Sequence, residues 1–270
     1  MVVEMLGALA GGYVLLVGGM AVFQRGMIYF PSPVRGEPAE AGLPEMVSVP
    51  VRTADGVLVA SWYAPSRRPG GATVVLFHGN SGSLAHRAVK ARALLDAGFG
   101  VLLAGYRGFG GNPGRPSEKG LYADARAALG WLGVRGVKAP QVALYGESLG
   151  TGVAVQMATE YAVAAVVLEA PYTRLPDLAP AVVPSGLAGM LMVDRFDNLA
   201  KIGAVQAPLL IVHGDADDVV PIGLGRRLFD AAATDKEGVF IAGGGHSDLW
   251  QRGIGATVVD FLDRRLGGAG

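Results

Sequence analysis

The chain alternates short apolar runs of strand length with longer stretches of helical composition, and this alternation restricts its fold more than any other feature. Several runs, such as residues 74–77, are apolar without a break, which is typical of parallel strands buried on both faces. Alternating strands and helices predict an α/β protein with a mostly parallel sheet, right-handed crossovers and helices on both faces. The expected strands are 47–52, 58–64, 73–78, 100–104, 141–145, 165–169, 209–213 and 238–241, and the expected helices are 84–97, 117–132, 149–161, 223–233 and 249–266.

The turn after the expected strand 141–145 carries a catalytic pattern. It reads Gly146-Glu147-Ser148-Leu149-Gly150 and leads into a helical stretch, which is the setting of strand, sharp turn and helix that the pattern G-x-S-x-G requires. Such a turn pushes the serine hydroxyl out of the sheet. A Cβ two residues before or after it would collide with the neighbouring strand and helix. The pattern therefore predicts Ser148 as a nucleophile.

A serine nucleophile needs a base and an acid that orients the base, and in this setting both follow it in the order Ser, acid, His. Three aspartates follow the expected strand 209–213, and we favour Asp217 as the acid over Asp215 and Asp218. The alternative role for these aspartates is to form turns or to cap a helix. His246, on the glycine-rich loop after the last strand, is the expected general base.

The oxyanion of a tetrahedral intermediate needs two backbone N–H donors. One is expected from Leu149, directly after the nucleophile. The other is expected from the loop that follows strand 73–78, where Asn80 is the first choice and Ser81 the second. The alternative is that this loop is an ordinary glycine-rich turn.

The N-terminal region contains a run of nineteen uncharged, mostly apolar residues, 5–23, which would span about 28 Å as a helix. This length matches the roughly 30 Å hydrocarbon core of a bilayer. Glu4 is the only charge before the run and no Ala-x-Ala cleavage site follows, so an uncleaved anchor is preferred over a signal peptide or a soluble apolar helix. Arg25 is the only basic residue that flanks the run, which favours a cytoplasmic C-terminal side but leaves the orientation open.

These observations divide the chain into an anchor over residues 1–30, a Pro- and Gly-containing linker over 31–45 and a catalytic domain over 46–270.

Composition excludes several other classes of protein. Hydrophobic residues make up 51% and charged residues 17%, so the chain is not disordered. The absence of cysteine excludes disulfides and thiol chemistry, and 23 basic residues balance 23 acidic ones. The four histidines are scattered, and the glycine-rich runs carry no dinucleotide or Gly-Lys-Ser/Thr pattern. We therefore expect no cofactor, no metal and, without a basic excess, no nucleic-acid partner.

Taken together, these motifs resemble the α/β-hydrolase superfamily and, more narrowly, its membrane-anchored Bem46-like serine hydrolases. The resemblance implies an α/β-hydrolase fold with a small cap, with Ser148 as nucleophile, Asp217 as acid and His246 as base. One position departs from the family, which usually has Asp before the Tyr-Arg-Gly run where this chain has Gly105. Whatever that acid orients, with Arg107 as the candidate, must be held by another group. The resemblance covers nearly the whole chain and is carried by residues 24–25, 28–31, 77–80, 106–110, 116–124, 146–150, 194–198, 213–221 and 245–246.

The family implies hydrolysis of an ester-type acyl bond. Residues 172–202 occupy the position of the cap, and Met190 and Met192 within it are candidates to line an acyl pocket, because flexible methionines adapt to varied chains. Ordinary core packing is the equal alternative. The short cap implies an open site.

Three functions follow from this reading. The first is a carboxylesterase or lipase-like hydrolase, whose partners are an acyl ester or lipid and the lipid bilayer. The second is an acyl-protein thioesterase or peptidase with the same triad. The third is a non-catalytic membrane scaffold, which the intact triad disfavours. The sequence leaves the natural substrate, the side of the membrane and the oligomeric state open.

Overall fold

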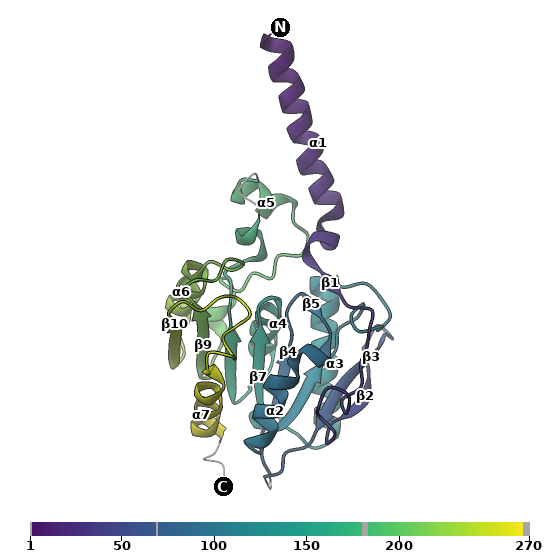
Figure 1. Ribbon diagram of the computed structural model, residues 1–270, viewed down its shortest axis with the longest axis vertical. Coiled ribbons are helices and arrows are strands. Elements are labelled where there is room, and N and C mark those ends of the chain that lie inside the picture. The colour runs from purple at the N-terminus through teal and green to yellow at the C-terminus, as the bar shows by residue number, and fades with distance from the viewer. Residues whose placement is uncertain (1, 69, 180–182, 267–270) are drawn as a thin grey trace.

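The computed structural model describes residues 2–68, 70–179 and 183–266. Among these residues, the centre of the molecule is an eight-stranded sheet with the order β10-β9-β8-β7-β4-β6-β3-β2 (Figure 1). Only the pairs β2–β3 and β3–β6 are antiparallel, so the prediction of a mostly parallel sheet is confirmed. The strands are β2 (Val47–Arg52), β3 (Leu58–Ala64), β4 (Thr73–Phe77), β6 (Gly100–Ala104), β7 (Val142–Glu147), β8 (Ala165–Glu169), β9 (Leu209–Gly214) and β10 (Lys236–Ile241).

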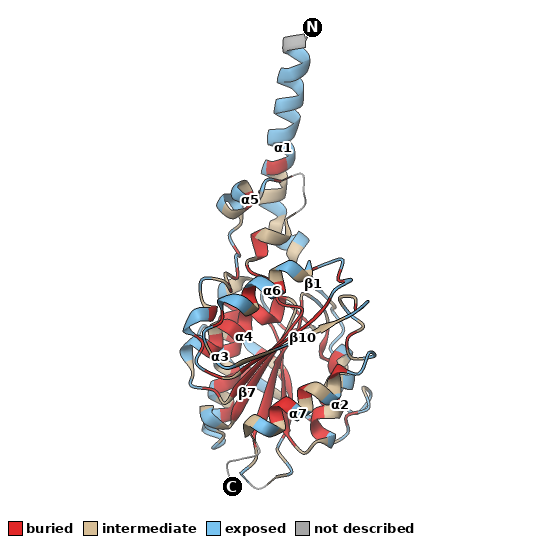
Figure 2. Ribbon diagram, turned by 90° about the vertical axis from the view of Figure 1, so that its left-hand side faces the viewer, coloured by how far each residue is buried: buried red, intermediate tan, exposed pale blue. Residues whose placement is uncertain are grey.

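Helices cover both faces of this sheet, because successive side chains of a strand point to opposite sides. In β4, Val75 and Phe77 pack into the core shared with α3 and α4, whereas Val74 and Leu76 pack into the core shared with α2 and α7. Figure 2 shows these two helical layers with the buried strands between them. The helices are α2 (Ala88–Asp96), α3 (Glu118–Val134), α4 (Leu149–Glu160), α6 (Ile222–Ala231) and α7 (Ile254–Leu266).

Two helix starts differ from the prediction by more than one residue. The segment expected as one helix over 84–97 begins with a 3-10 turn, η1 (Leu84–Arg87), before α2 starts. The helix expected from residue 249 begins only at Ile254, because residues 248–253 form hydrogen-bonded turns and Gly253 has a φ of +90°. A left-handed residue interrupts a right-handed helix, so α7 starts after it.

Helix α1 (Val2–Ile28) projects away from the body of the molecule (Figure 1). It is long and apolar enough to cross a bilayer over Glu4–Ile28, with a mean hydropathy of 1.9, and most of it is exposed. After it, β1 (Phe30–Pro31) pairs in parallel with β5 (Ser81–Gly82), close to the carboxyl end of β4. Residues 31–45 then run along the body, where Leu43 is fully buried.

The cap lies between β8 and β9 and consists of η3 (Leu175–Leu178), α5 (Ser185–Leu191) and η4 (Ile202–Ala204). Helix α5 stands above the sheet beside the lower half of α1 in both views (Figures 1 and 2). Val17 of α1 packs there against Val183 and Ala188 of the cap. The cap and the N-terminal helix therefore form one apolar layer over the carboxyl edge of the sheet.

The structure also accounts for the departure at Gly105. A Cβ at this position would lie 2.0 Å from the carbonyl oxygen of Ala60 on β3, so no side chain fits there. Arg107 is held by two other carboxylates. Its Nε donates to Asp124 Oδ1 at 2.9 Å, and its Nη1 donates to Asp55 Oδ2 at 2.7 Å.

This geometry predicts that Gly105→Ala destabilises the protein. Overpacking against a strand backbone typically costs about 1–3 kcal/mol. Gly130→Ala is the matched control, because Gly130 lies inside α3 with no atom within 4 Å of the added Cβ. That change should stabilise the protein by roughly 0.5–1 kcal/mol. Urea unfolding of both variants measures the difference, and a Gly105→Ala protein as stable as Gly130→Ala would contradict the account.

Candidate active site

Ser148 sits on a strained turn between β7 and α4. Its φ of +50° is uncommon for a residue with a side chain. The flanking glycines are required by space. A Cβ on Gly146 would lie 2.6 Å from Thr151 Cα, and one on Gly150 would lie 2.0 Å from the carbonyl oxygen of Phe77. A Cβ at either position would therefore collide, as expected from the sequence. The two glycines allow α4 to lie against the end of β4.

Three of the predicted site residues form one hydrogen-bonded line. His246 Nε2 lies 3.0 Å from Ser148 Oγ, and His246 Nδ1 lies 2.8 Å from Asp217 Oδ2. Ser148 comes from the turn after β7, Asp217 from the loop after β9 and His246 from the loop after β10. The carboxyl ends of parallel strands share one edge of the sheet, so residues 98 positions apart meet there.

Asp217 is held in its ionised form. Burial alone would raise the pKa of its carboxyl, but hydrogen bonds from His213 and His246 outweigh this effect and hold the pKa well below its usual range. The backbone N–H groups of Val219 and Val220 add donors to Oδ1 at 2.9 and 2.7 Å. An ionised carboxylate only accepts, so the proton of the His246 imidazole is on Nδ1. Nε2 is then free to accept the Ser148 hydroxyl proton.

The competing aspartates have other positions. Asp215 is exposed and its Oδ1 accepts the N–H of Gly243 at 2.7 Å, and Asp218 is exposed. The buried His213 donates from Nε2 to the carbonyl of Val220 at 2.8 Å, and the same nitrogen lies 3.3 Å from Asp217 Oδ2. His213 therefore fixes the loop that carries Asp217.

The two predicted oxyanion donors lie beside Ser148. Leu149 is the first residue of α4, so its N–H has no acceptor within the helix. Asn80 follows β4 and lines the same pocket as Ser148 and Leu149. The side-chain amide of Asn80 donates to the carbonyl of Ile28 at 2.9 Å. The main-chain carbonyl of Asn80 accepts the N–H of Phe30 at 2.8 Å. Asn80 is thus fixed by the end of the N-terminal helix, whereas Ser81 is exposed.

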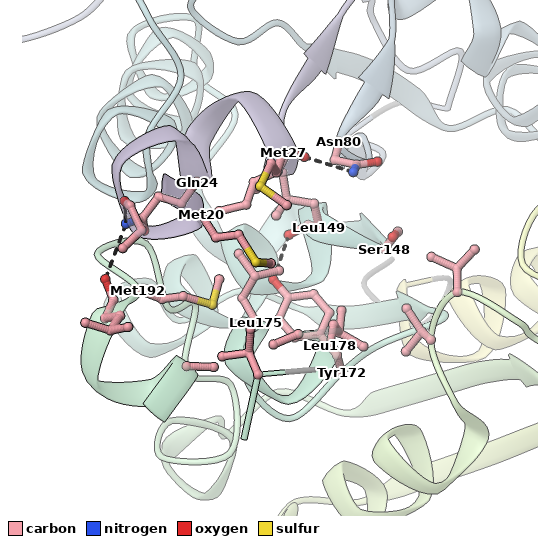
Figure 3. Close-up of a pocket in the computed structure, with 18 of the residues that line it drawn as sticks. Met20, Gln24, Met27, Asn80, Ser148, Leu149, Tyr172, Leu175, Leu178 and Met192 are labelled. Atoms are coloured by element: carbon pink, nitrogen blue, oxygen red, sulfur yellow. Dashed lines mark hydrogen bonds between the residues drawn. The ribbon is translucent and has the colours of Figure 1, made fainter. Parts of the chain in front are cut away.

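Ser148 opens into a cavity of about 330 Å³, within the usual range for small-molecule sites. The described lining residues carry no charged side chain, and their polar side chains are those of Gln24, Asn80, Ser148 and Tyr172. Figure 3 shows Ser148 at one side of this cavity and Met192 at the other. The remaining lining residues are Val17, Met20, Ala21, Met27, Ile28, Leu149, Leu175, Leu178, Ala179, Val183, Ala188, Leu191, Met192, Val219 and Val220.

The two methionines predicted to line an acyl pocket lie in different surroundings. Met192 lines the cavity, but Met190 is 78% exposed and lies outside it, so the prediction for Met190 is wrong. Met190 belongs to α5 and Met192 follows the end of that helix. Residues two apart do not share a face of a helix, so the two side chains point in different directions.

Sequence reasoning missed the wall that α1 contributes. Six residues of this helix line the cavity, at positions 17, 20, 21, 24, 27 and 28. Their spacing of three, four and seven places them on one helical face. No sequence pattern marked this face, because a helix that is apolar on every side has no distinct stripe.

A buried network of charges lies behind the Ser148 turn. Lys90 Nζ is 2.6 Å from Glu147 Oε2 and 2.6 Å from Glu169 Oε2, and Arg87 Nη2 is 2.6 Å from Glu147 Oε1. Burial would raise the pKa of Glu147, but Lys90 and Arg87 outweigh it and hold the pKa well below its usual range. The Ser148 N–H donates to the carbonyl of Glu169 at 2.9 Å. The network therefore stabilises the two strands that position Ser148.

Comparison with known proteins places this arrangement among hydrolases. The family described as serine aminopeptidase S33 matches residues 69–195. An uncharacterised protein of Mycobacterium tuberculosis is 41% identical over 249 residues, which cover 92% of this chain and 88% of that protein. Human alpha/beta hydrolase domain-containing protein 17B is 36% identical over 152 residues, or 53% of this chain and 49% of that protein.

Among solved structures, the chain is similar to an esterase of Pyrococcus furiosus, with a TM-score of 0.71 and 21% identity. The superposition covers 87% of this chain and 99% of the esterase. At this identity the similarity establishes the fold. In the described residues, no group of three or more His, Asp or Glu side chains is arranged to hold a metal ion.

The charge network predicts a large effect of Lys90→Met. Removing one partner of a buried ion pair typically costs about 3–5 kcal/mol, because it leaves an uncompensated buried charge. A carboxyl with a depressed native pKa stabilises the fold above its unfolded pKa and loses that contribution as the pH falls. The stability difference between Lys90→Met and the wild type should therefore be largest at neutral pH and shrink in acid.

Urea unfolding at a series of pH values measures this difference. Lys119→Met, at an exposed lysine on α3, is the matched control and should stay within about 0.5 kcal/mol of the wild type. A Lys90→Met protein that behaves like this control would show that the network contributes nothing to the fold.

Proposed function

Because this chain belongs to the α/β-hydrolase superfamily, we propose that it is a membrane-anchored serine hydrolase that cleaves carboxylic acyl esters through an acyl-enzyme on Ser148. The observation that carries the proposal is the hydrogen-bonded line from Asp217 through His246 to Ser148, at 2.8 and 3.0 Å. This line ends at an apolar cavity with room for an acyl group.

In this proposal Ser148 Oγ attacks the ester carbonyl carbon and His246 Nε2 takes the hydroxyl proton. The tetrahedral intermediate collapses as the C–O bond breaks, and His246 returns the proton to the departing alkoxide. Water then attacks the acyl-enzyme by the same route, which releases the carboxylic acid and restores Ser148. Asp217 stays ionised and stabilises the imidazolium that forms in both steps.

The negative oxygen of each tetrahedral intermediate would accept from the backbone N–H groups of Leu149 and Asn80. Both residues line the cavity with Ser148, and the N-terminus of α4 adds a favourable dipole for developing negative charge. Loss of one such donor typically lowers the rate by about 10²–10³-fold.

We assign residues 1–30 to the anchor, 31–45 to the connection and 46–270 to the catalytic domain. The length and hydropathy of α1 suit a membrane span, and its exposure distinguishes it from the core helix of a soluble protein. Cleavage as a signal peptide would remove one wall of the cavity and the Ile28 carbonyl that holds Asn80. These contacts support an uncleaved anchor.

The match to an aminopeptidase family favours a second candidate, amide hydrolysis by the same triad. An aminopeptidase binds a protonated α-amino group, which calls for a carboxylate in the pocket. The described residues that line the cavity include no carboxylate, and this favours esters of apolar acids. Parallel assays with acyl esters, acyl thioesters and amino-acyl amides distinguish the candidates.

The role of Ser148 as nucleophile is tested by removing its hydroxyl. Ser148→Ala should lower kcat for p-nitrophenyl acyl esters on the order of 10⁶-fold, as loss of a nucleophilic serine does elsewhere, with the fold intact. Ser48→Ala, at an exposed serine on β2, is the control and should keep wild-type rates. Turnover by a folded Ser148→Ala protein would exclude Ser148 as the nucleophile.

The acid is tested by comparing Asp217 with its neighbour Asp218. Asp217→Asn should lower kcat by about 10⁴-fold, because the amide favours the wrong imidazole tautomer, whereas Asp218→Asn should leave kcat near the wild-type value. The pKa of Asp217 is well below its usual range, so Asp217 stays charged in mildly acidic solution. Equal rates for the two variants would assign the acid elsewhere.

A further inference from the structure

The N-terminal helix lines the cavity, which a simple membrane tether would not do. Val17, Met20 and Ala21 line the cavity beside Ser148, yet the same residues lie inside the apolar run 5–23 that would span a bilayer. From Val17 to Phe23 the helix rises about 9 Å, so roughly this length of the span lies alongside the cap. The substrate cavity and the membrane segment therefore overlap.

The docked end of α1 is fixed by polar contacts with the cap. Arg25 donates to both carboxylate oxygens of the buried Asp194, at 2.9 and 3.2 Å, and Tyr29 donates to the same group at 3.0 Å. Gln24 accepts the N–H of Val193 at 2.7 Å and donates to the carbonyl of Leu191 at 3.3 Å. These contacts bind the helix to the cap at a fixed rotation, with one face toward the cavity.

Both the helix and the cap expose apolar side chains at this level. We define the apolar collar as Val22 and Phe23 of α1 together with Met190, Leu191 and Val193 of the cap. Their side chains are 77%, 72%, 78%, 38% and 67% exposed, respectively. Exposed apolar groups gathered in one region mark a surface that contacts a partner or a membrane. Because the collar continues the exposed apolar surface of α1, its partner is the hydrocarbon of the same bilayer.

Leu191 connects the collar to the cavity, because it lines the cavity and is itself exposed. An acyl chain that passes Leu191 would leave hydrocarbon and enter a pocket whose described lining is almost entirely apolar. Along this route the apolar surface of the chain stays out of water, whereas a chain that crossed the aqueous phase would expose that surface to water. Ser148 lies at the far side of the cavity from Met192, where the ester carbonyl would stop (Figure 3).

We propose that the last turns of α1 are part of the substrate site and that the substrate is a long-chain acyl ester of a membrane lipid, drawn from the bilayer that holds α1. This inference rests on the proposed function, because it assigns the acyl chain of the same reaction. Helix α1 and the cap then set the acyl-chain preference, and the bilayer supplies the substrate.

A pair of neighbouring residues tests the wall. Ala21 lines the cavity, whereas Val22 points outward at 77% exposure. Ala21→Trp fills the pocket, and each methylene that it excludes should lower binding by about fourfold. We expect the ratio of kcat/KM for hexadecanoyl to butanoyl p-nitrophenyl esters to fall tenfold or more. Val22→Trp should leave the ratio unchanged. Equal ratios in the two variants and the wild type would overturn the proposal.

A measurement on the unchanged protein tests the source of the substrate. The full chain is reconstituted in phosphatidylcholine vesicles that contain a fluorogenic hexadecanoyl ester, or is mixed with separate vesicles that contain that ester. We expect hydrolysis in the shared vesicles and at least tenfold less in the separate ones. Equal rates would overturn the proposal in favour of substrate taken from water.

The failure of this proposal is distinct from the failure of the proposed function. One outcome is that Ser148→Ala abolishes hydrolysis of the butanoyl ester while Ala21→Trp leaves the chain-length preference unchanged. In that case the esterase assignment stands and the acyl site lies elsewhere. If Ser148→Ala hydrolyses both esters at the wild-type rate, the proposed function itself fails.

Discussion

The close approach of α4 to the end of β4 determines the rest of the site. At Gly150 the helix lies so near the Phe77 carbonyl that a Cβ would be 2.0 Å from it, so only glycine allows the contact. This contact brings the Ser148 turn beside the loop that carries Asn80. Asn80 in turn holds the end of α1 through the carbonyl of Ile28. Packing at one glycine thus links the Ser148 turn, the Asn80 loop and the N-terminal helix.

Close to Ser148, buried charge is compensated in two places. Asp217 is surrounded by donors from two histidines and two backbone N–H groups, and Glu147 is paired with Lys90 and Arg87 behind the turn. The cavity between Ser148 and the cap has a mostly apolar lining among the described residues. In the proposed reaction, fixed dipoles would face the reacting carbonyl and the acyl chain would meet a mostly apolar lining, as preorganised catalysis requires.

Much of this arrangement followed from local sequence. The apolar strands and the G-x-S-x-G turn gave the mostly parallel sheet and the place of Ser148, because each depends on residues near in sequence. Chain order then placed the acid among three aspartates and the base at His246, and the favoured Asp217 is the one that lies within hydrogen-bond distance of that histidine. The roles of these residues remain predictions. The pocket could not be derived in this way, since α1 is apolar on every face and the exposed Met190 differs from Met192 only by helix geometry.

The most direct test of the account is the site of covalent reaction with an alkyl fluorophosphonate, located by peptide mass spectrometry on the full chain in detergent. Fluorophosphonates react with a serine whose hydroxyl is activated by a base. The account predicts a single adduct on Ser148, and a much slower reaction in His246→Ala, where the serine is present but its base is absent. An adduct on another residue, or equal labelling in His246→Ala, would contradict a catalytic line from Asp217 through His246 to Ser148.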